Sequence, residues 1–222
     1  DQLRKKTVAN VEAGIRGLSA FQLPDGSFAY WPGGGTPSVW GTSYAGHFLI
    51  EAEQKGFDVP SALLNQWKKY QRKAARSWSP SGRRTDFEQR QEQLLQAYRL
   101  FTLSLAGEPE LGSMNRLRER SDLSGECKWR LAAAYSLAGQ NETARELVGN
   151  ASTETEDYDA YGVTFGSGTR DMAMILETMV LMGMRDEAVP VVEALSSRLS
   201  GEQWMSCLLY TSPSPRDRTR SR

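Results

Sequence analysis

Residues 23–46 read LPDGSFAYWPGGGTPSVWGTSYAG and contain six glycines, three prolines, two tryptophans and two tyrosines. We call them the aromatic–glycine segment. Within it, the Asp25-Gly26 pair predicts a turn, because glycine adopts positive φ without strain. The glycines at 33–35 do not match a phosphate-binding loop, which needs a Lys-Ser/Thr step entering a helix. The segment therefore marks either a functional surface or an elaborate connection between two helices.

Helical patterns flank this segment and continue along the chain. Apolar residues recur at three- and four-residue steps, as they do on amphipathic helices. Because no two-residue alternation long enough for a sheet is present, we predict an all-α fold. The apolar stripes run through residues 3–21, 44–52, 63–70, 94–105, 111–117, 127–138, 144–148, 172–179 and 189–199.

Polar side chains mark where several of these helices begin. Thr42 or Ser43 is predicted to cap a helix that begins near Tyr44. Ser61, next to the break at Asp58-Val59-Pro60, is predicted to cap the following helix. Further helix starts are predicted at Asp86 and Gly125.

Three junctions between helices resemble one another: SLAGEPELG, SLAGQNETA and LMGMRDEA. Each has an apolar helix end, a glycine and a few polar residues before a new helix. A glycine at this place suits the left-handed C′ position of a helix. The glycines are Gly107, Gly139 and Gly183, separated by 32 and 44 residues. No fixed period therefore supports a tetratricopeptide-type solenoid. We predict instead an α/α toroid of paired helical hairpins, incomplete at both ends, over residues 1–206.

Residues 207–222, CLLYTSPSPRDRTRSR, break with the rest of the chain. They show no helical or strand period, and they carry four of the 27 basic residues and one of the 27 acidic ones. We interpret them as a non-native, disordered tail, because CLLYTSPSPRD looks like a translated sequencing adaptor. The remaining residues then carry a net charge of about −3, which gives no electrostatic footprint for nucleic acid. No apolar run is long enough to insert into a membrane.

Few residues suit catalysis or metal binding. His47 is the only histidine, which excludes a two-histidine metal site, and we predict no catalytic, cofactor or metal site. Cys127 is interpreted as a small buried apolar residue. Paired acids, which glycosidases need, occur in DYDAY (157–161) and at Glu154 and Glu156. We expect these acids to lie in a solvated loop.

Four aromatic residues of the aromatic–glycine segment, Phe28, Tyr30, Trp31 and Trp40, have two interpretations. Aromatic rings bury large areas at a low entropy cost, so this group suits a sugar-binding or peptide-binding groove. We favour the alternative that they fill one end of the helical barrel and cover its inner helices.

The stretch LSAFQLPDGSFAYWPGGG, followed by VWGTSYAGHFLIEAEQKGFDVP, resembles the α/α-toroid thioester-type domain of the alpha-2-macroglobulin family, most closely its bacterial branch. Members carry a helix ending in a Gln-x-x-Asp-Gly-aromatic turn, a tryptophan-bearing loop and a Thr-x-Tyr/Phe helix start. YRLFTLSLAGEPELGSMNRLRE and KWRLAAAYSLAGQNETARELV look like later hairpins of the family, so the resemblance covers nearly all of residues 1–205. The signature residues here are Gln22, Asp25, Gly26, Phe28, Trp31, Trp40, Thr42 and Tyr44.

The resemblance implies a fragment of a large bacterial protein, extracellular, periplasmic or anchored at the cell surface, that inhibits proteases and is not an enzyme. A protease cuts a bait segment elsewhere in such a protein, which then rearranges and traps it. In many members a thioester within a Cys-x-Glu-Gln stretch, upstream of the aromatic turn, also bonds the attacker covalently. No such stretch occurs here, and Cys127, in GECKWR, does not match it. The implied partners are proteases, through the full-length protein, and neighbouring domains of the same chain.

Two other functions fit the sequence less well. An enzyme on the same toroid, of the terpene cyclase or glycan-processing kind, is the main alternative. A cyclase needs an acidic initiating motif such as Asp-x-Asp-Asp, and DYDAY lacks the third acid. A helical-repeat binding scaffold would need the fixed period that the glycine spacing does not show.

The packing interpretation of the aromatic residues makes a prediction. Replacing either Trp31 or Trp40 with Ala is expected to lower the free energy of unfolding by about 2–5 kcal/mol, as for buried aromatic residues generally. An unchanged thermal midpoint combined with lost protease or ligand binding would contradict the packing interpretation.

Overall fold

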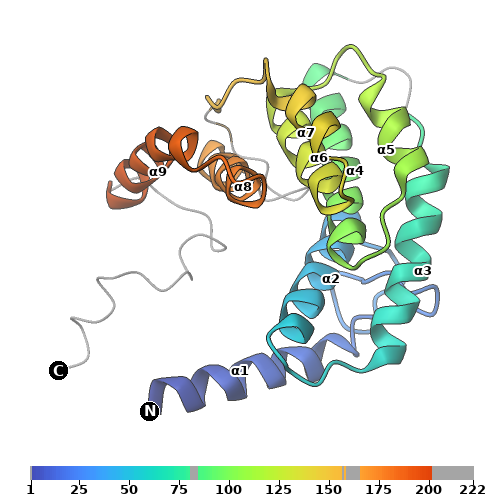
Figure 1. Ribbon diagram of the computed structural model, residues 1–222. Helices are drawn as coiled ribbons and strands as arrows, with labels where there is room; N and C mark the ends of the chain where they lie inside the picture. Colours follow the sequence, from blue (N-terminus) through green and yellow to red (C-terminus); the bar gives the residue numbers. More distant parts are fainter. Residues whose placement is uncertain (1, 81–84, 157, 159–165, 202–222) are drawn as a thin grey trace. The chain divides into compact units, whose positions relative to one another are not determined.

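The structure is a computed structural model that describes residues 2–80, 85–156, 158 and 166–201. Within these ranges it contains nine α-helices and two isolated β-bridges but no strand. Figure 1 shows how the helices follow one another along the chain. The all-α fold predicted from the sequence is therefore confirmed. The helices are α1 (Gln2–Leu18), α2 (Val39–Gln54), α3 (Ser61–Ser77), α4 (Asp86–Leu105), α5 (Leu111–Arg118), α6 (Gly125–Leu137), α7 (Asn141–Val148), α8 (Gly168–Leu181) and α9 (Arg185–Ser200).

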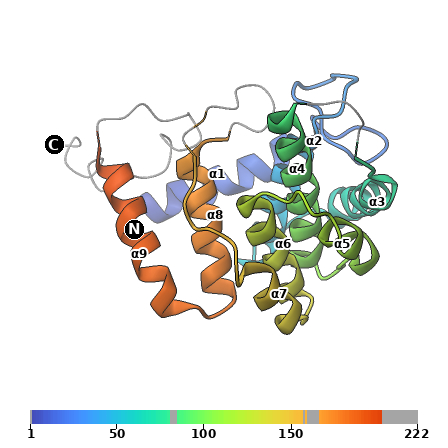
Figure 2. The same cartoon turned by 90° about the horizontal axis from the view of Figure 1, so that it is seen from above.

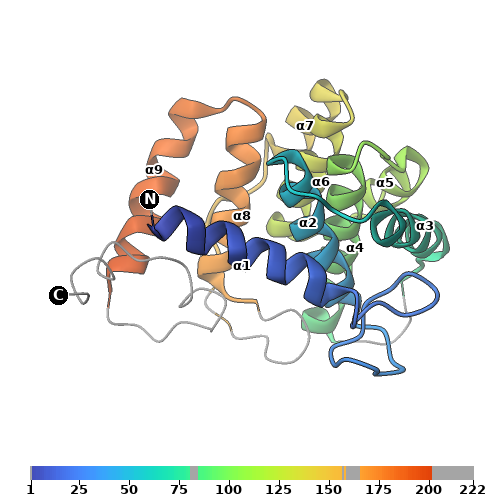
Figure 3. The same cartoon turned by 90° about the horizontal axis from the view of Figure 1, so that it is seen from below.

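The chain divides into two compact units, Asp1–Ala151 and Ser152–Arg222. The first unit contains α1 to α7, and the second contains α8 and α9, which pack against each other as a hairpin (Figure 3). The expected single domain over residues 1–206 stays a prediction. The interpretation of residues 207–222 as a non-native tail falls outside the described residues.

The first unit is built from helical hairpins in two layers. Helices α2, α4 and α6 pack side by side, and α3 and α5 pack against each other and against α4 (Figures 1 and 2). Most residues of α4 and α6 are buried, as expected for inner helices that have neighbours on several sides. In contrast, α3 buries one stripe, Leu63, Leu64, Trp67, Gln71 and Ala75. Only Ile15 of α1 is buried, so α1 is the least embedded helix of this unit.

Two of the predicted helix starts are confirmed. Helix α4 begins at Asp86, and the Thr85 side chain accepts a hydrogen bond from the backbone N–H of Glu88 while Glu88 reaches back to the N–H of Thr85. Helix α6 begins at Gly125. The reciprocal capping by Thr85 and Glu88 at the start of α4 satisfies backbone N–H groups that have no partner inside the helix.

The predicted start of α2 is wrong. The helix begins at Val39, because the Ser38 hydroxyl accepts a hydrogen bond from the N–H of Gly41 at 3.1 Å. The expected capping residues, Thr42 and Ser43, lie within the helix and are buried. Likewise, Ser61 does not cap α3, whose N-cap position is taken by a proline without a side-chain hydrogen bond.

The three predicted glycine junctions are confirmed. Gly107, Gly139 and Gly183 have φ values of +76°, +75° and +73°. In each case the next residue donates a backbone hydrogen bond of 2.9 Å to a carbonyl five residues earlier, to Leu103, Tyr135 and Met179 respectively. This is the Schellman arrangement, which only glycine adopts without strain. The same local chemistry therefore ends α4, α6 and α8.

The core between α2 and α3 centres on Trp67, which is fully buried. Its indole lies directly on the backbone of Gly46, where a Cβ atom would come within 2.0 Å of the ring. Ala45, Leu49 and Leu63 surround this contact. Glycine at position 46 therefore permits the tryptophan to seat between the two helices.

Gly46→Ala is expected to destabilise the protein by about 1–3 kcal/mol or more, because the rigid indole must shift to admit the new methyl group. Gly17→Ala provides the matched control, since Gly17 is also helical and has nothing within 4 Å of the position of its Cβ. The control is expected to gain about 0.5–1 kcal/mol from helix propensity. Urea denaturation measures both changes, and equal effects would contradict the close approach of Trp67.

Candidate functional site

The turn that opens the aromatic–glycine segment is clamped onto α3. Gly26 has φ = +93°, and a Cβ there would lie 2.2 Å from the Gln66 carbonyl oxygen. The Gln22 side chain donates a hydrogen bond of 2.9 Å to the Leu63 carbonyl. The predicted Asp25-Gly26 turn is thus confirmed, and its glycine is required both by its φ and by the neighbouring helix.

Asp25 stabilises the same turn. Its carboxylate accepts hydrogen bonds from the Ser27 hydroxyl at 2.6 Å and from the Ser27 backbone N–H at 3.0 Å. The hydroxyl bond is the main reason why the pKa of Asp25 lies below its usual value. A carboxylate that favours its charged form in this way serves as a hydrogen-bond acceptor in the turn rather than as a general acid.

The Thr42 hydroxyl joins the loop part of the segment, residues 23–38, to α2. It accepts a hydrogen bond from the Phe28 backbone N–H at 2.9 Å and donates one to the Ser38 carbonyl at 2.6 Å. The Ser38 N–H in turn donates to the Phe28 carbonyl at 2.8 Å. On the opposite side, the Trp67 indole N–H donates to the Thr42 carbonyl at 2.8 Å. One buried threonine therefore connects the segment, the start of α2 and α3.

A row of aromatic rings continues inward from α2. Trp40 stacks on Tyr98 with ring centroids 4.7 Å apart, and Tyr98 stacks on Phe101 at 6.3 Å. The guanidinium of Arg130, which is buried, lies 4.3 Å from the centroid of the Phe101 ring. These contacts tie α2 to α4 and α6 through offset-stacking and cation–π interactions.

The structure divides the four aromatic residues of the segment into two pairs. Phe28 and Trp40 are buried, at 2% and 6% exposure, which agrees with the packing interpretation. Tyr30 and Trp31 are 54% and 70% exposed, so the prediction that they fill the helical barrel is wrong. They contact each other edge-to-face, with ring centroids 5.3 Å apart, because the Pro- and Gly-rich loop carries them away from the helices. Exposed aromatic rings of this kind suit contact with another surface.

A buried polar network crosses the interface of α2, α3 and α4, and sequence reasoning missed it. The Gln71 amide donates to the Ser43 hydroxyl at 2.9 Å, and its carbonyl oxygen accepts from Arg99 at 3.1 Å. Gln96 donates to the Ala75 carbonyl at 3.2 Å. The missed signal is the spacing of Trp67, Gln71 and Ala75, which places Gln71 on the buried stripe of α3.

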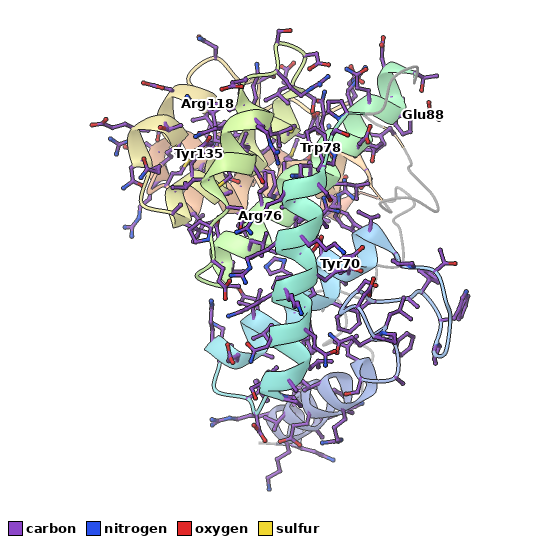
Figure 4. All side chains as sticks on the ribbon, turned by 90° about the vertical axis from the view of Figure 1, so that its right-hand side faces the viewer. Tyr70, Arg76, Trp78, Glu88, Arg118 and Tyr135 are labelled. Carbon is purple, nitrogen blue, oxygen red and sulfur yellow. The ribbon has the colours of Figure 1, made fainter. Side chains whose placement is uncertain are left out.

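Outside its buried stripe, α3 faces solvent wholly or in part. Arg76 forms a bidentate ion pair with Glu110, with N–O distances of 2.8 and 2.9 Å, on the other side of the helix from Tyr70 (Figure 4). Lys68 and Arg72 both approach Glu108. Exposed pairs of this kind contribute little to stability. Tyr70 is half-buried, and burial raises its pKa above the usual value.

His47 and Cys127, the side chains closest to catalytic types, both pack against other residues. Nδ1 of His47, which is half-buried, lies 2.9 Å from the Tyr98 hydroxyl. Cys127 is completely buried, and burial raises the pKa of its thiol far above the usual value. It is therefore a packed thiol and not an activated nucleophile, as the sequence predicted.

The acidic candidates do not form a site in the described part of the chain. Glu154 and Glu156 are exposed, as expected for a solvated loop. In DYDAY, Asp157 and Asp159 fall outside the described residues, whereas the Tyr158 hydroxyl donates to the buried Asp171 carboxylate at 2.5 Å. Across the described ranges, no group of three or more His, Cys, Asp and Glu residues is placed to hold a metal ion.

No model of a known protein family matches the chain, but individual proteins do. The alpha-2-macroglobulin of Escherichia coli (strain K12) is 26% identical over 211 residues, which is 91% of this chain and 13% of the relative. A crystal structure of native E. coli alpha-2-macroglobulin, from domain MG7 to the C-terminus, matches with a TM-score of 0.77 at 25% identity, over 91% of this chain and 33% of that chain. This similarity confirms the α/α-toroid class.

A third match is the E. coli alpha-2-macroglobulin activated by porcine elastase. It has a TM-score of 0.76 and 25% identity, and the match covers 91% of this chain and 18% of that chain. The resemblance read from the aromatic–glycine segment is thus confirmed by proteins that match nine-tenths of the chain. The eight signature residues keep their assignment as a prediction, with Trp31 now placed on the surface.

Because Trp40 is buried and Trp31 is exposed, their replacement by Ala is no longer expected to lower the free energy of unfolding equally. Trp40→Ala is expected to lower the free energy of unfolding by about 3–5 kcal/mol, because it empties a packed site against Tyr98. Trp31→Ala, the matched control from the same segment, is expected to change it by about 0.5 kcal/mol or less. Urea denaturation at 25 °C distinguishes them, and a loss at Trp31 as large as that at Trp40 would contradict the structure.

Proposed function

We propose that the chain belongs to the alpha-2-macroglobulin family and is part of a broad-spectrum inhibitor that traps attacking proteases. The observation that carries this proposal is the match over 91% of the chain to E. coli alpha-2-macroglobulin, including the form activated by porcine elastase. Because the chain spans 13% of the length of that relative, the trapping activity belongs to a longer protein.

Within such an inhibitor, we propose a structural and not an enzymatic role for this chain. The helices pack around Trp67, and the aromatic–glycine segment is fixed by the turn at Gly26 and by Thr42. His47 and Cys127, the residues closest to catalytic types, are used in packing. In this role the first unit, Asp1–Ala151, moves as one body when a bait segment elsewhere in the protein is cut.

The proposed trap does not use a thioester from this chain. The sequence has no Cys-x-Glu-Gln stretch, and the thiol of Cys127 is buried with a raised pKa. Since a thiolate is required to form a thioester or to attack one, this cysteine is unsuitable. Covalent capture, where it occurs, depends on residues outside this chain.

The family also indicates where the protein acts and what it contacts. We propose an extracellular, periplasmic or cell-surface location in a bacterium, with proteases as partners of the full-length protein and neighbouring domains as partners of this chain. In the described residues, no helix has the length and apolar character needed to cross a membrane.

The full-length protein encoded around this chain tests the proposal. It is incubated with trypsin or elastase, and cleavage of a small chromogenic peptide and of a large protein substrate are measured in parallel. A trap encloses the protease without blocking its active site, so cleavage of the peptide is expected to persist while cleavage of the large substrate falls to background.

Heat-denatured inhibitor serves as the control and is expected to protect neither substrate. Loss of both activities would indicate an inhibitor that occupies the protease active site. Retention of both would show that the protein does not trap proteases. Either result would overturn the proposal.

A further inference from the structure

Arg99 on α4 is a buried cation surrounded by neutral partners. Its side chain is held in the interface of α3 and α4, where the residue is 6% exposed. Nε donates to the Gln71 side-chain oxygen at 3.1 Å, and Nη1 donates to the Gln96 side-chain oxygen. Both partners are amides, and each is fixed by a further bond, to Ser43 and to the Ala75 carbonyl.

Three other arginines of the same unit meet carboxylates, whereas the buried Arg130 lies over the rings of Tyr98 and Phe101. Arg72 pairs with Glu108, Arg76 with Glu110, and Arg120 with Asp122. All three are more exposed than Arg99. The need for a counter-charge is greatest for the most buried charge, yet these more exposed arginines have one and Arg99 does not. Burying a charge without a counter-charge is unfavourable, so buried arginines are normally paired. Among the ion pairs of the described residues, none includes Arg99.

The guanidinium of Arg99 also has donors to spare. It carries five N–H groups, and its Nη2 makes no hydrogen bond to a described residue. Burial lowers the pKa of Arg99, the direction expected for a cation without a counter-charge, but a guanidinium stays protonated at neutral pH. Nearby, the charge of Arg99 acts on the half-buried Tyr70, opposing the rise in its pKa that burial causes.

We propose that Arg99 binds an oxyanion, carboxylate or phosphate, through its Nη2 edge, with Gln71 and Gln96 holding the guanidinium in place. The planar fork of arginine fits the two oxygens of such a group. A carboxylate from elsewhere in the longer protein and a free phosphate share this chemistry. The bound anion supplies the counter-charge that the α2–α3–α4 interface lacks.

Thermal unfolding of this chain tests the site, with sodium chloride replaced stepwise by sodium phosphate or sodium acetate at constant ionic strength. A specific site raises the midpoint with saturation, as RT ln(1 + [L]/Kd) requires. General salt effects continue to increase without saturation. A saturable rise with phosphate alone identifies a phosphate site, one with acetate alone identifies a carboxylate site, and one with both identifies a general oxyanion site.

Two variants assign the effect to Arg99. Arg99→Met is expected to abolish the saturable rise and leave only the general salt effect. The matched control, Arg72→Met, is expected to retain the saturable rise, because Arg72 already has Glu108 as its partner.

If Arg99→Met does not fold, calorimetric titration takes its place. Phosphate and acetate are titrated into the unmodified chain and into Arg99→Lys, which keeps the positive charge but loses the planar fork of the guanidinium. We expect one site in the unmodified chain and weaker binding in Arg99→Lys. No saturable effect in the unmodified chain, or one equally strong in the Arg99 variants, would overturn the proposal.

Discussion

The seating of the Trp67 indole against Gly46 is the contact on which the first unit depends. The ring is completely buried and takes the space that any other side chain at position 46 would occupy. Its N–H is satisfied by the Thr42 carbonyl, so the largest buried side chain of α3 carries no unpaired polar group into the core. One glycine and one tryptophan thus fix the distance and the register between α2 and α3.

Thr42 connects this contact to the aromatic–glycine segment by hydrogen bonds. The same residue that receives the indole N–H on its carbonyl receives the Phe28 N–H on its hydroxyl. Residues 23–38, which precede α2, need this connection because their backbone pairs only in short turns and in two isolated β-bridges. Turns and bends interrupt the loop at Gly26 and Gly33, and hydrogen bonds to α2 and α3 keep it in place. The segment therefore behaves as part of the helical body, from which the rings of Tyr30, Trp31 and Tyr44 project.

The sequence was most informative where local chemistry decides the structure. Gly107, Gly139 and Gly183 ended their helices as predicted, because a positive φ is a property of the residue and its immediate neighbours. Predictions failed where tertiary contacts decided. Thr42 was read as a cap, but its hydroxyl is taken by Phe28, which is 14 residues away. Trp31 was read as buried, since periodicity does not reveal which ring of a loop faces the core. Arg99 was overlooked because one of its two amide partners, Gln71, comes from another helix.

Thr42 holds the aromatic–glycine segment on the helices. Native-state hydrogen exchange measured residue by residue, in the unmodified chain and in Thr42→Val, tests it most directly. The valine keeps the shape of the side chain and removes the acceptor of the Phe28 N–H. The amides of Phe28 and Ser38 are expected to lose protection, while those in the middle of α6 exchange as before. Unchanged protection at Phe28 and Ser38 would show that the segment is held by other contacts and would contradict the account.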